Sequence, residues 1–477
     1  MLDERRYAPA WNSLRKHLVP KWLDEGKFGI YTHWGVYSVP ACGPNGSWYP
    51  HNMYKEGTQQ YEYHVKHYGH PSRFGYKDFI PMFKAERFNP EEWAELFKKA
   101  GAKFAGPVAE HHDGFSMWDS EINEWNAARM GPQRDIVGEL EKAIRKQGMK
   151  FMVAFHHAAN WWYYPHWRRE FDTSNPRYSG LYGPIHNQDA ENDLRWEDQD
   201  KPNKEFLERW KNKIREVIDK YKPDMIWFDF GLKFIQDRYK REVIAYYFNK
   251  AVEWNAEVTI CYKGHSIPPG CGIVDYELGR ESELTYHRWI TDTDIAIGGR
   301  WSYIHGIEYK STRWIIHYLL DNVSKNGYLL LNVGPKANGE IPEPAKERLL
   351  EIGEWLKING EAIYGTSPWV TYGEGPTKMK LSGGFAEKEE VFYTAEDVRF
   401  TVKNNALYAV LLGWPGGGKR ITIKSLSRLY KSEVNSVTML GIDKELEWSL
   451  TKEGLKVRMP NEKPCEHAYV IKILRDG

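Results

Sequence analysis

Up to about Thr366, short apolar runs of strand length alternate with segments in which apolar residues recur at helical spacing. Residues 89–102, NPEEWAELFKKAGA, are typical of the helical segments: Asn89 can cap the first turn, Pro90 suits the first helical position and Gly101 lies near the stop. Such an alternation predicts a parallel sheet with helical crossovers, and its length suits a (β/α)8-like TIM barrel over residues 1–367. We expect strands within 28–38, 103–115, 150–158, 225–232, 258–264, 272–279 and 328–334, and further helices at 135–148, 206–222 and 345–360.

The pattern changes from about Pro368, where segments with every second residue apolar follow one another between Gly, Asn and Lys turns. Examples are VRFTVK, LYAVLLGW, RITIKSL and LKVRM, and no helix-period segment follows them. We therefore predict an antiparallel β-sandwich as a second domain over residues 368–477.

Polar side chains stand where the predicted barrel strands end. In a TIM barrel the active site lies at the C-terminal ends of the strands, so these side chains are expected to converge at one mouth. They are His33, His111, His112, Asp113, His156, His157, Asp229, Lys263, Asp275 and Glu277.

Two chemistries compete for this set. Histidine and aspartate are common ligands of zinc or iron, but neighbouring residues of a strand point to opposite faces, which separates His111 from His112 unless the strand breaks there. Asp229, set between Phe228 and Phe230, is costly to bury without a partner. Paired with Glu277, it could hydrolyse a glycoside, and the 21 tryptophans would then line a sugar site. We favour the carboxylate pair and expect no metal.

Composition excludes several classes of protein. Lys plus Arg number 66 against 65 Asp plus Glu, so nothing indicates a nucleic acid or a charged membrane as partner. No run approaches the roughly 18 apolar residues of a membrane span. The four cysteines form no CxxC pair, and the N-terminus has no apolar signal region. We expect a cytoplasmic protein, or a secreted one if a leader has been removed.

Several motifs, taken together, resemble glycoside hydrolase family 29, the α-L-fucosidases. They run in order over residues 10–370, and DVRFTVKNNALYAVLLGWP resembles the sandwich domain of these enzymes. The motifs are KFGIYTHWGVYSVPA, WYPHNMY, EHHDGFSMWDS, GPQRDIVGEL, WFDF, DYELGRE, RWITDTDI, RWSYIHG and YLLLNVGP.

The resemblance implies retaining hydrolysis of terminal α-linked L-fucose without a metal or an organic cofactor. The family's nucleophile falls on Asp229, and its acid/base falls within DYELGRE, where we favour Glu277 and keep Glu281 as the alternative. Its sugar-binding positions fall on His33, His111, His112, Trp48, Trp227 and Trp301.

Two departures from the family pattern stand out. Ser47 occupies a place where many members have a sugar-binding glutamate. FMVAFHHA carries histidines where other members have a fucose-facing aromatic residue, and the sequence leaves open whether His156 or His157 faces the sugar.

The expected partner is a fucosylated oligosaccharide or glycoconjugate, with linkage and a homo-oligomer left open. Three alternatives also stay open: a retaining glycosidase for another sugar, a carbohydrate-binding homologue without catalysis, and a metal-dependent hydrolase.

Overall fold

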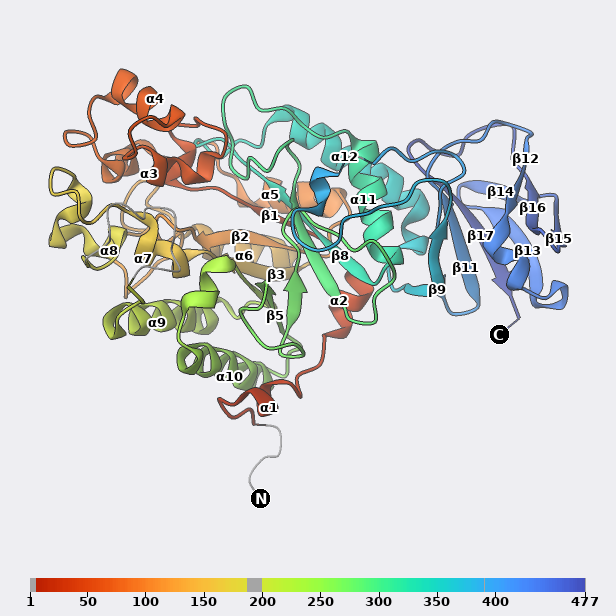
Figure 1. Cartoon of the computed structure of the whole chain (residues 1–477), viewed down its shortest axis with the longest axis horizontal. Helices are drawn as coiled ribbons and strands as arrows, with labels where there is room; N and C mark the ends of the chain where they lie inside the picture. Colours follow the sequence, from red (N-terminus) through yellow and green to blue (C-terminus); the bar gives the residue numbers. More distant parts are fainter. Residues whose placement is uncertain (1–5, 187–199, 390, 477) are drawn as a thin grey trace.

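The first domain is a closed barrel of eight parallel strands in the computed structural model, which describes residues 6–186, 200–389 and 391–476. The strands follow in chain order around the barrel, and β8 closes it by pairing with β1 (Figure 1). This confirms the predicted TIM barrel. The strands are β1 (Phe28–Thr32), β2 (Phe104–Glu110), β3 (Lys150–Phe155), β4 (Met225–Phe228), β5 (Thr259–Lys263), β6 (Ile273–Asp275), β7 (Trp289–Asp294) and β8 (Gly327–Val333).

Six long helices accompany the strands, and two connections between successive strands lack a helix. No α-helix separates β5 from β6 or β6 from β7, although all other successive barrel strands of the described chain have one between them. Asn89 caps its helix as expected, since its side chain accepts from the backbone N–H groups of Glu91 and Glu92. The long helices are α5 (Pro90–Lys99), α6 (Ile136–Lys146), α9 (Lys204–Tyr221), α10 (Asp237–Trp254), α11 (Thr312–Ser324) and α12 (Glu343–Asn359).

Strand β7 was not predicted. Four of its six residues are polar, a composition that favours a loop, yet each of these four is at most 1% exposed. The strand tolerates them because buried partners satisfy them: the Tyr31 hydroxyl donates to Asp292, and the Asn332 amide donates to Asp294.

The second domain consists of two antiparallel sheets that enclose one apolar cluster, which includes Phe400, Leu407, Ile423 and Leu455. This confirms the predicted β-sandwich. The six-stranded sheet has the order β14 (Ile442–Glu445), β13 (Val434–Met439), β17 (Tyr469–Arg475), β11 (Ala406–Leu411), β10 (Val398–Lys403) and β9 (Ser367–Glu374); the other contains β12 (Arg420–Ile423), β16 (Gly454–Arg458) and β15 (Trp448–Thr451).

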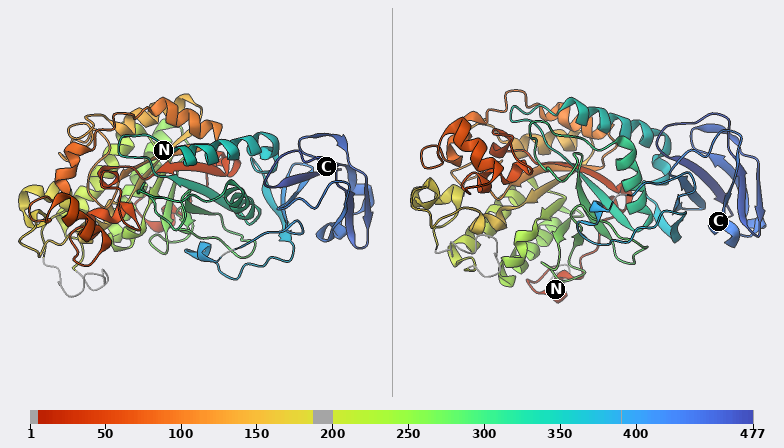
Figure 2. Two further views of the ribbon diagram at one scale, coloured as in Figure 1. Left: turned by 90° about the horizontal axis from the view of Figure 1, so that it is seen from above. Right: turned by 45° about the horizontal axis from the view of Figure 1, so that its top comes forward.

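The sandwich lies beside the barrel, as both views in Figure 2 show. Helix α11 packs against β8 on one side and against β9 and β10 on the other. At this contact Arg399 Nε lies 2.7 Å from Asp321 Oδ1, and Lys325 Nζ lies 2.9 Å from Asp321 Oδ2. The division between residues 367 and 368 stays a prediction; residue 367 already belongs to β9.

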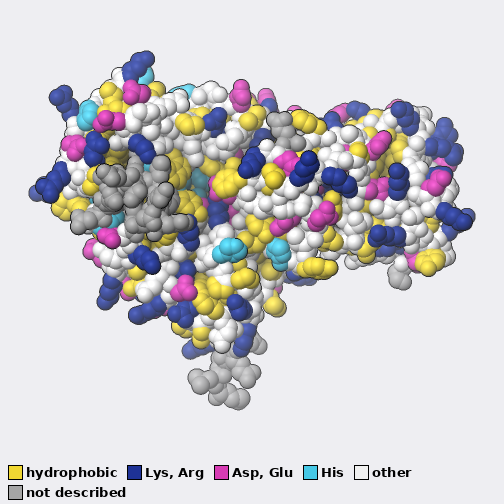
Figure 3. All heavy atoms as spheres, in the orientation of Figure 1, with side chains coloured by type: hydrophobic (Ala, Val, Ile, Leu, Met, Phe, Trp, Pro, Cys, Tyr) yellow, Lys and Arg dark blue, Asp and Glu magenta, His cyan; other side chains and the backbone are white. Residues whose placement is uncertain are grey.

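Short elements fill the connections around the barrel mouth and the sandwich. No helix within the described ranges is long and apolar enough to cross a membrane. On the face shown in Figure 3, basic and acidic side chains are interspersed. The short elements are α1 (Trp11–Leu14), α2 (Lys21–Gly26), η1 (Val36–Ser38), η2 (Gly46–Trp48), α3 (Tyr49–Asn52), α4 (Gln59–Tyr68), η3 (Tyr76–Met82), η4 (His157–Ala159), α7 (Asn160–Tyr163), η5 (Asp172–Ser174), η6 (Pro176–Tyr178), α8 (Ser179–Tyr182), η8 (Phe230–Phe234), η9 (Gly360–Ala362), η10 (Ala386–Lys388), η11 (Lys424–Arg428) and η12 (Lys431–Glu433).

Candidate active site

Imidazole and charged side chains follow the first six barrel strands at their C-terminal ends. Because the strands are parallel and the barrel is closed, these ends meet at one mouth. The structure brings together His33 after β1, His111 and His112 after β2, His156 after β3, Asp229 after β4, Lys263 at the end of β5 and Glu277 after β6.

Asp229 is 5% exposed and held from two sides. Lys263 Nζ lies 3.0 Å from its Oδ1, while Oδ2 faces His156 Nδ1 at 3.0 Å and His112 Nε2 at 3.3 Å. Burial alone raises the pKa of Asp229, but the Lys263 charge, followed by His156 and the imidazole hydrogen bonds, outweighs burial and holds the pKa well below its usual value. Asp229 is therefore an ionised and firmly oriented carboxylate.

Glu277 shares the lysine with Asp229 but is tuned in the opposite direction. Its Oε2 lies 2.8 Å from Lys263 Nζ, and its side chain is 20% exposed. Burial raises the pKa of Glu277 to about 7; repulsion from Asp292 and Asp229 adds to the rise and Lys263 opposes it. Near neutral pH, one carboxyl is thus ionised while the other still carries a proton in part of the molecules. Such a pair can divide nucleophilic and acid/base work.

Glu281, the alternative acid/base, does not line the cavity that Glu277 lines. Its side chain is beside the Tyr276 hydroxyl and contributes, after burial, to raising the pKa of that phenol. Lys325 Nζ donates to its backbone carbonyl at 2.9 Å. Glu277 lines the cavity at the barrel mouth and Glu281 does not. The geometry therefore favours Glu277.

His111 and His112 both lie at the mouth, although adjacent strand residues would point apart. Strand β2 ends at Glu110, so the alternation of an extended chain no longer applies to the two histidines. Their ring centroids are 4.3 Å apart, and His111 stacks on His156 at 4.6 Å. His112 Nδ1 also faces the backbone carbonyl of His156 at 2.7 Å.

Of the two neighbouring histidines His156 and His157, the first faces Asp229. His157 begins the 3-10 helix η4 and turns away toward Trp210, whose backbone carbonyl lies 3.4 Å from its Nε2. Burial lowers the pKa of His157 to about 4. His157 is therefore a packed core histidine.

The three tryptophans named from the sequence differ in depth. Trp227 is fully buried inside the barrel, with Lys263 Nζ 4.7 Å from its ring centroid, so it forms the floor of the site. Trp301 is 7% exposed and lies 5.3 Å from the His33 ring. The ring centroids of Trp48 and His112 are 5.4 Å apart. Trp48 and Trp301 are thus placed as walls of the site.

Two further acids lie beneath the site. Asp292 Oδ2 is 3.6 Å from Lys263 Nζ and accepts a hydrogen bond of 3.0 Å from Tyr31. The Asp292 backbone N–H donates to Asp275 Oδ1 at 2.9 Å. Burial, followed by the neighbouring Asp292, raises the pKa of Asp275 well above its usual value. Sequence reasoning gave no role to Asp292, and the only available signal was the DTD stretch in a strand that was missed.

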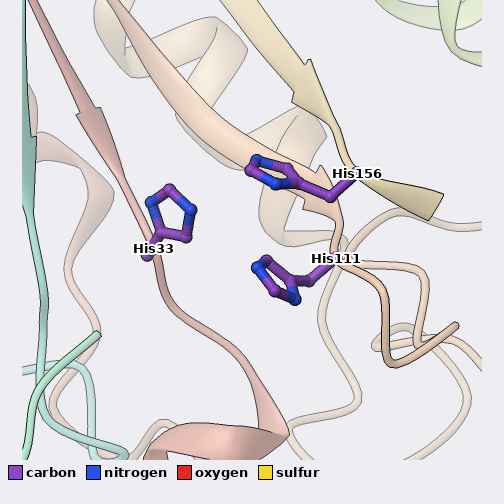
Figure 4. Close-up of side chains that lie close together, drawn as sticks. All are labelled: His33, His111 and His156. Atoms are coloured by element: carbon purple, nitrogen blue, oxygen red, sulfur yellow. The ribbon is translucent and has the colours of Figure 1, made fainter. Parts of the chain in front are cut away.

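Three imidazoles at the mouth could also hold a metal ion. One ring nitrogen from each of His33, His111 and His156 lies within 4.8 Å of the others, and the rings face a common space in Figure 4. His33 Nδ1 is 2.9 Å from Asn332 Oδ1. Burial is the largest cause lowering the pKa of all three, so they are neutral imidazoles. Neutral imidazoles can bind either sugar hydroxyls or a metal. His112, His156 and Asp229 form a second group of the same kind.

Comparison with known proteins covers nearly the whole chain. The Alpha-L-fucosidase family model matches residues 1–361, and the alpha-L-fucosidase C-terminal domain model matches residues 389–474. Tissue alpha-L-fucosidase of Bos taurus is 34% identical over 489 residues, covering 99% of this chain and 92% of that protein. The same-named protein of Homo sapiens is 32% identical over 485 residues, with coverage of 98% and 92%.

Solved structures agree with these matches. The Thermotoga maritima alpha-fucosidase in complex with fucose is 32% identical, with a TM-score of 0.77 and coverage of 98% of this chain and 100% of that one. The same protein in complex with a mechanism-based inhibitor is 31% identical, also with a TM-score of 0.77. With the barrel, the sandwich and both family models matched in order along the chain, this protein belongs to the α-L-fucosidase family.

Proposed function

We propose that this protein is a retaining exo-α-L-fucosidase in which Asp229 is the nucleophile and Glu277 the acid/base. The observation that carries the proposal is the position of Lys263, whose single ammonium group lies 3.0 Å from Asp229 and 2.8 Å from Glu277. Lys263 keeps Asp229 ionised as a nucleophile, while burial and repulsion from Asp292 and Asp229 keep a proton on Glu277 in spite of the lysine.

In the first step, Asp229 attacks the anomeric carbon of the fucoside from the face opposite the leaving group. The bond from this carbon to the glycosidic oxygen breaks, and Glu277 transfers its proton to that oxygen. Asp229 is then a neutral ester and Glu277 an anion. The negative charge has moved from one neighbour of Lys263 to the other, so the ammonium is paired before and after the step.

In the second step, water attacks the anomeric carbon from the face that the leaving group vacated. Glu277 accepts the water proton, and the bond to Asp229 breaks to release fucose. With Asp229 esterified, its repulsion no longer raises the pKa of Glu277, while Lys263 still lowers it. The same residue is therefore better suited to act as a base in this step.

The distance between the two carboxyl groups supports retention. Asp229 Oδ1 and Glu277 Oε2 both lie within 3.0 Å of Lys263 Nζ, so these oxygens are no more than about 6 Å apart. Retaining glycosidases hold their carboxyls about 5 to 5.5 Å apart, whereas inverting enzymes need about 6.5 to 9.5 Å to admit a water molecule.

The sugar would occupy the space between the histidines and Trp301. His33 donates from Nδ1 to Asn332, which leaves Nε2 as an acceptor for a hydroxyl. His111 Nδ1 is buried and has no partner within the described residues, so it is available to a ligand. We assign His33, His111 and His112 to the fucose hydroxyls, with Trp48 and Trp301 as aromatic walls and Trp227 as the floor.

Hydrolysis of a chromogenic aryl α-L-fucoside within a panel of other aryl glycosides tests the proposal. We expect turnover of the fucoside, and proton NMR should detect α-fucose as the first product. An initial β-anomer would contradict retention, and turnover of a different aryl glycoside alone would favour another sugar. No hydrolysis of any glycoside, together with tight fucose binding, would indicate a binding protein that lacks catalysis.

A metal-dependent hydrolase is the second candidate, and the group His33, His111 and His156 is the observation in its favour. Activity that survives exhaustive chelation would exclude it. The low pKa of Asp229 beside the raised pKa of Glu277 supports the glycosidase, because carboxylate catalysis needs this contrast.

The proposed partner is a fucosylated oligosaccharide or glycoconjugate, without nucleic acid or membrane. A homo-oligomer and a cytoplasmic location stay predictions. All four cysteines are free thiols. Relatives named plasma alpha-L-fucosidase do not support the cytoplasmic location.

A further inference from the structure

The connection between β9 and β10 leaves the sandwich and returns to the barrel mouth. In Figure 1 its short helix η10, drawn in blue, lies against the green strands of the barrel. Phe385 donates its backbone N–H to the Glu277 carbonyl at 2.7 Å, and Glu387 donates to the Leu278 carbonyl at 2.8 Å. Gly383 and Arg280 exchange two further backbone hydrogen bonds, of 2.7 and 3.2 Å. The segment 383–387 is thus anchored to the stretch of chain that carries Glu277.

Between this segment and β5 and β6 lies a cavity of about 640 Å³. Lys263 and Glu277 are among its lining residues, and most of the remaining wall is apolar. A cavity of this size is typical of small-molecule sites. Its apolar wall includes Tyr262, Ile267, Val274 and Phe385.

Phe385 has two properties that are unusual together. Its side chain is 54% exposed, and its backbone has a φ of 60° in the left-handed region, which bulky residues rarely adopt. Leu278 and Trp301, also near the mouth, have φ values of 44° and 56°. Strained backbone of this kind persists where the surrounding structure holds it and is concentrated at functional sites. Here the hydrogen bond to Glu277 holds an exposed aromatic ring at the cavity rim.

We propose that this cavity is the leaving-group subsite and that Phe385 forms its outer aromatic wall. Through this wall, the cavity selects leaving groups with a flat apolar face. The proposal rests on the proposed function, since the proton of Glu277 goes to the oxygen that joins fucose to its leaving group. Whatever is bonded to that oxygen must therefore begin beside Glu277 and extend into the adjoining space. The apolar face of a second sugar ring, or an aryl group in its place, matches an aromatic and aliphatic wall.

The test compares substrates with and without a leaving group large enough to reach Phe385. We would measure kcat/KM of Phe385→Ala on a fucosylated disaccharide, on 4-nitrophenyl α-L-fucoside and on α-L-fucosyl fluoride. The first two substrates should lose about fivefold more than the fluoride does, the size expected for one lost aromatic contact. Phe385→Tyr should restore most of the loss, because the ring is kept.

Phe392→Ala is the matched control, since Phe392 lies in the same connection, is 80% exposed and does not line this cavity. It should not change the ratio between the three substrates. Equal losses on all three with Phe385→Ala would overturn the proposal and make Phe385 a positioning residue for Glu277. Unchanged kcat/KM on all three would also overturn it. The unaltered protein tests the proposed function: if it hydrolysed no fucoside, that function and this inference would both fail. The variants test only the subsite, so the two failures are distinguishable.

Discussion

Replacing Lys263 by methionine removes one charge from between two carboxyls while keeping most of the side-chain volume. The ammonium lies 3.0 Å from Asp229, 2.8 Å from Glu277 and 3.6 Å from Asp292, and all three contacts are buried. At such distances a pair of unit charges attracts by about 5 kcal/mol with an effective dielectric constant of about 20. Breaking a buried pair typically costs about 3 to 5 kcal/mol.

We therefore expect kcat/KM of Lys263→Met at neutral pH to fall by about 10² to 10³-fold, which corresponds to about 3 to 4 kcal/mol. Lys263 lowers the pKa of both Asp229 and Glu277, so its loss raises both. The active form needs Asp229 ionised and Glu277 protonated. Both limbs of the pH profile should therefore move to higher pH.

The assay is kcat/KM for an aryl α-L-fucoside as a function of pH, with thermal unfolding to confirm that the variant is folded. Lys263→Arg keeps the charge and is the control, which should leave the limbs much closer to their original pH. A folded Lys263→Met enzyme with reduced activity and unmoved limbs would refute the electrostatic reasoning. Near-normal activity would refute any role for the shared cation.

The other predictions concern the nucleophile, the acid/base, the sugar and the metal. Asp229→Gly should be almost inactive, and azide should restore turnover to give β-fucosyl azide; no rescue would count against Asp229 as nucleophile. Glu277→Ala should lose less on activated aryl fucosides than on natural ones and give the α-azide, whereas a natural-substrate defect confined to Glu281→Ala would move the role there. His33→Ala should lower kcat/KM by an amount that corresponds to about 2 to 4 kcal/mol of transition-state stabilisation, the range for one lost oriented hydrogen-bonding partner. An unchanged kcat/KM would remove His33 from the sugar site. Exhaustive chelation should leave activity intact, and a loss restored by one particular metal would instead favour the histidine group as a metal centre.

The sequence predicted the architecture well because barrel and sandwich are both encoded in local periodicity. Strand β7 escaped because its buried polar residues resemble a loop, and only their partners on other strands make them tolerable. Periodicity also stops at a strand end, where the site begins. For this reason strand alternation argued against His111 and His112 sharing one mouth, and it left open whether His156 or His157 faces that mouth.

The sequence was enough to predict which residues line the candidate site, but less so to predict which of them contact one another. Asp229 and Glu277 were predicted as the carboxylate pair from strand position and family motifs. Lys263 was visible as one more polar residue at a strand end, but its place between two carboxyls depends on how β4, β5 and β6 lie side by side. Phe385 gave no signal at all, since Glu277, to which its backbone N–H donates, is more than a hundred residues away in the chain.

The hydrogen bonds that join Gly383–Glu387 to Glu277–Arg280 have a consequence for how such a protein could change over generations. The side chains grouped around Asp229 come from the barrel, whereas Phe385 comes from the connection between two sandwich strands. Insertions, deletions or exchanges within that connection can alter one end of the cavity while the barrel sequence stays as it is. Descendants could therefore diverge in the glycans they trim while inheriting the same choice of sugar. A library confined to residues 381–389 would sample that divergence in the laboratory.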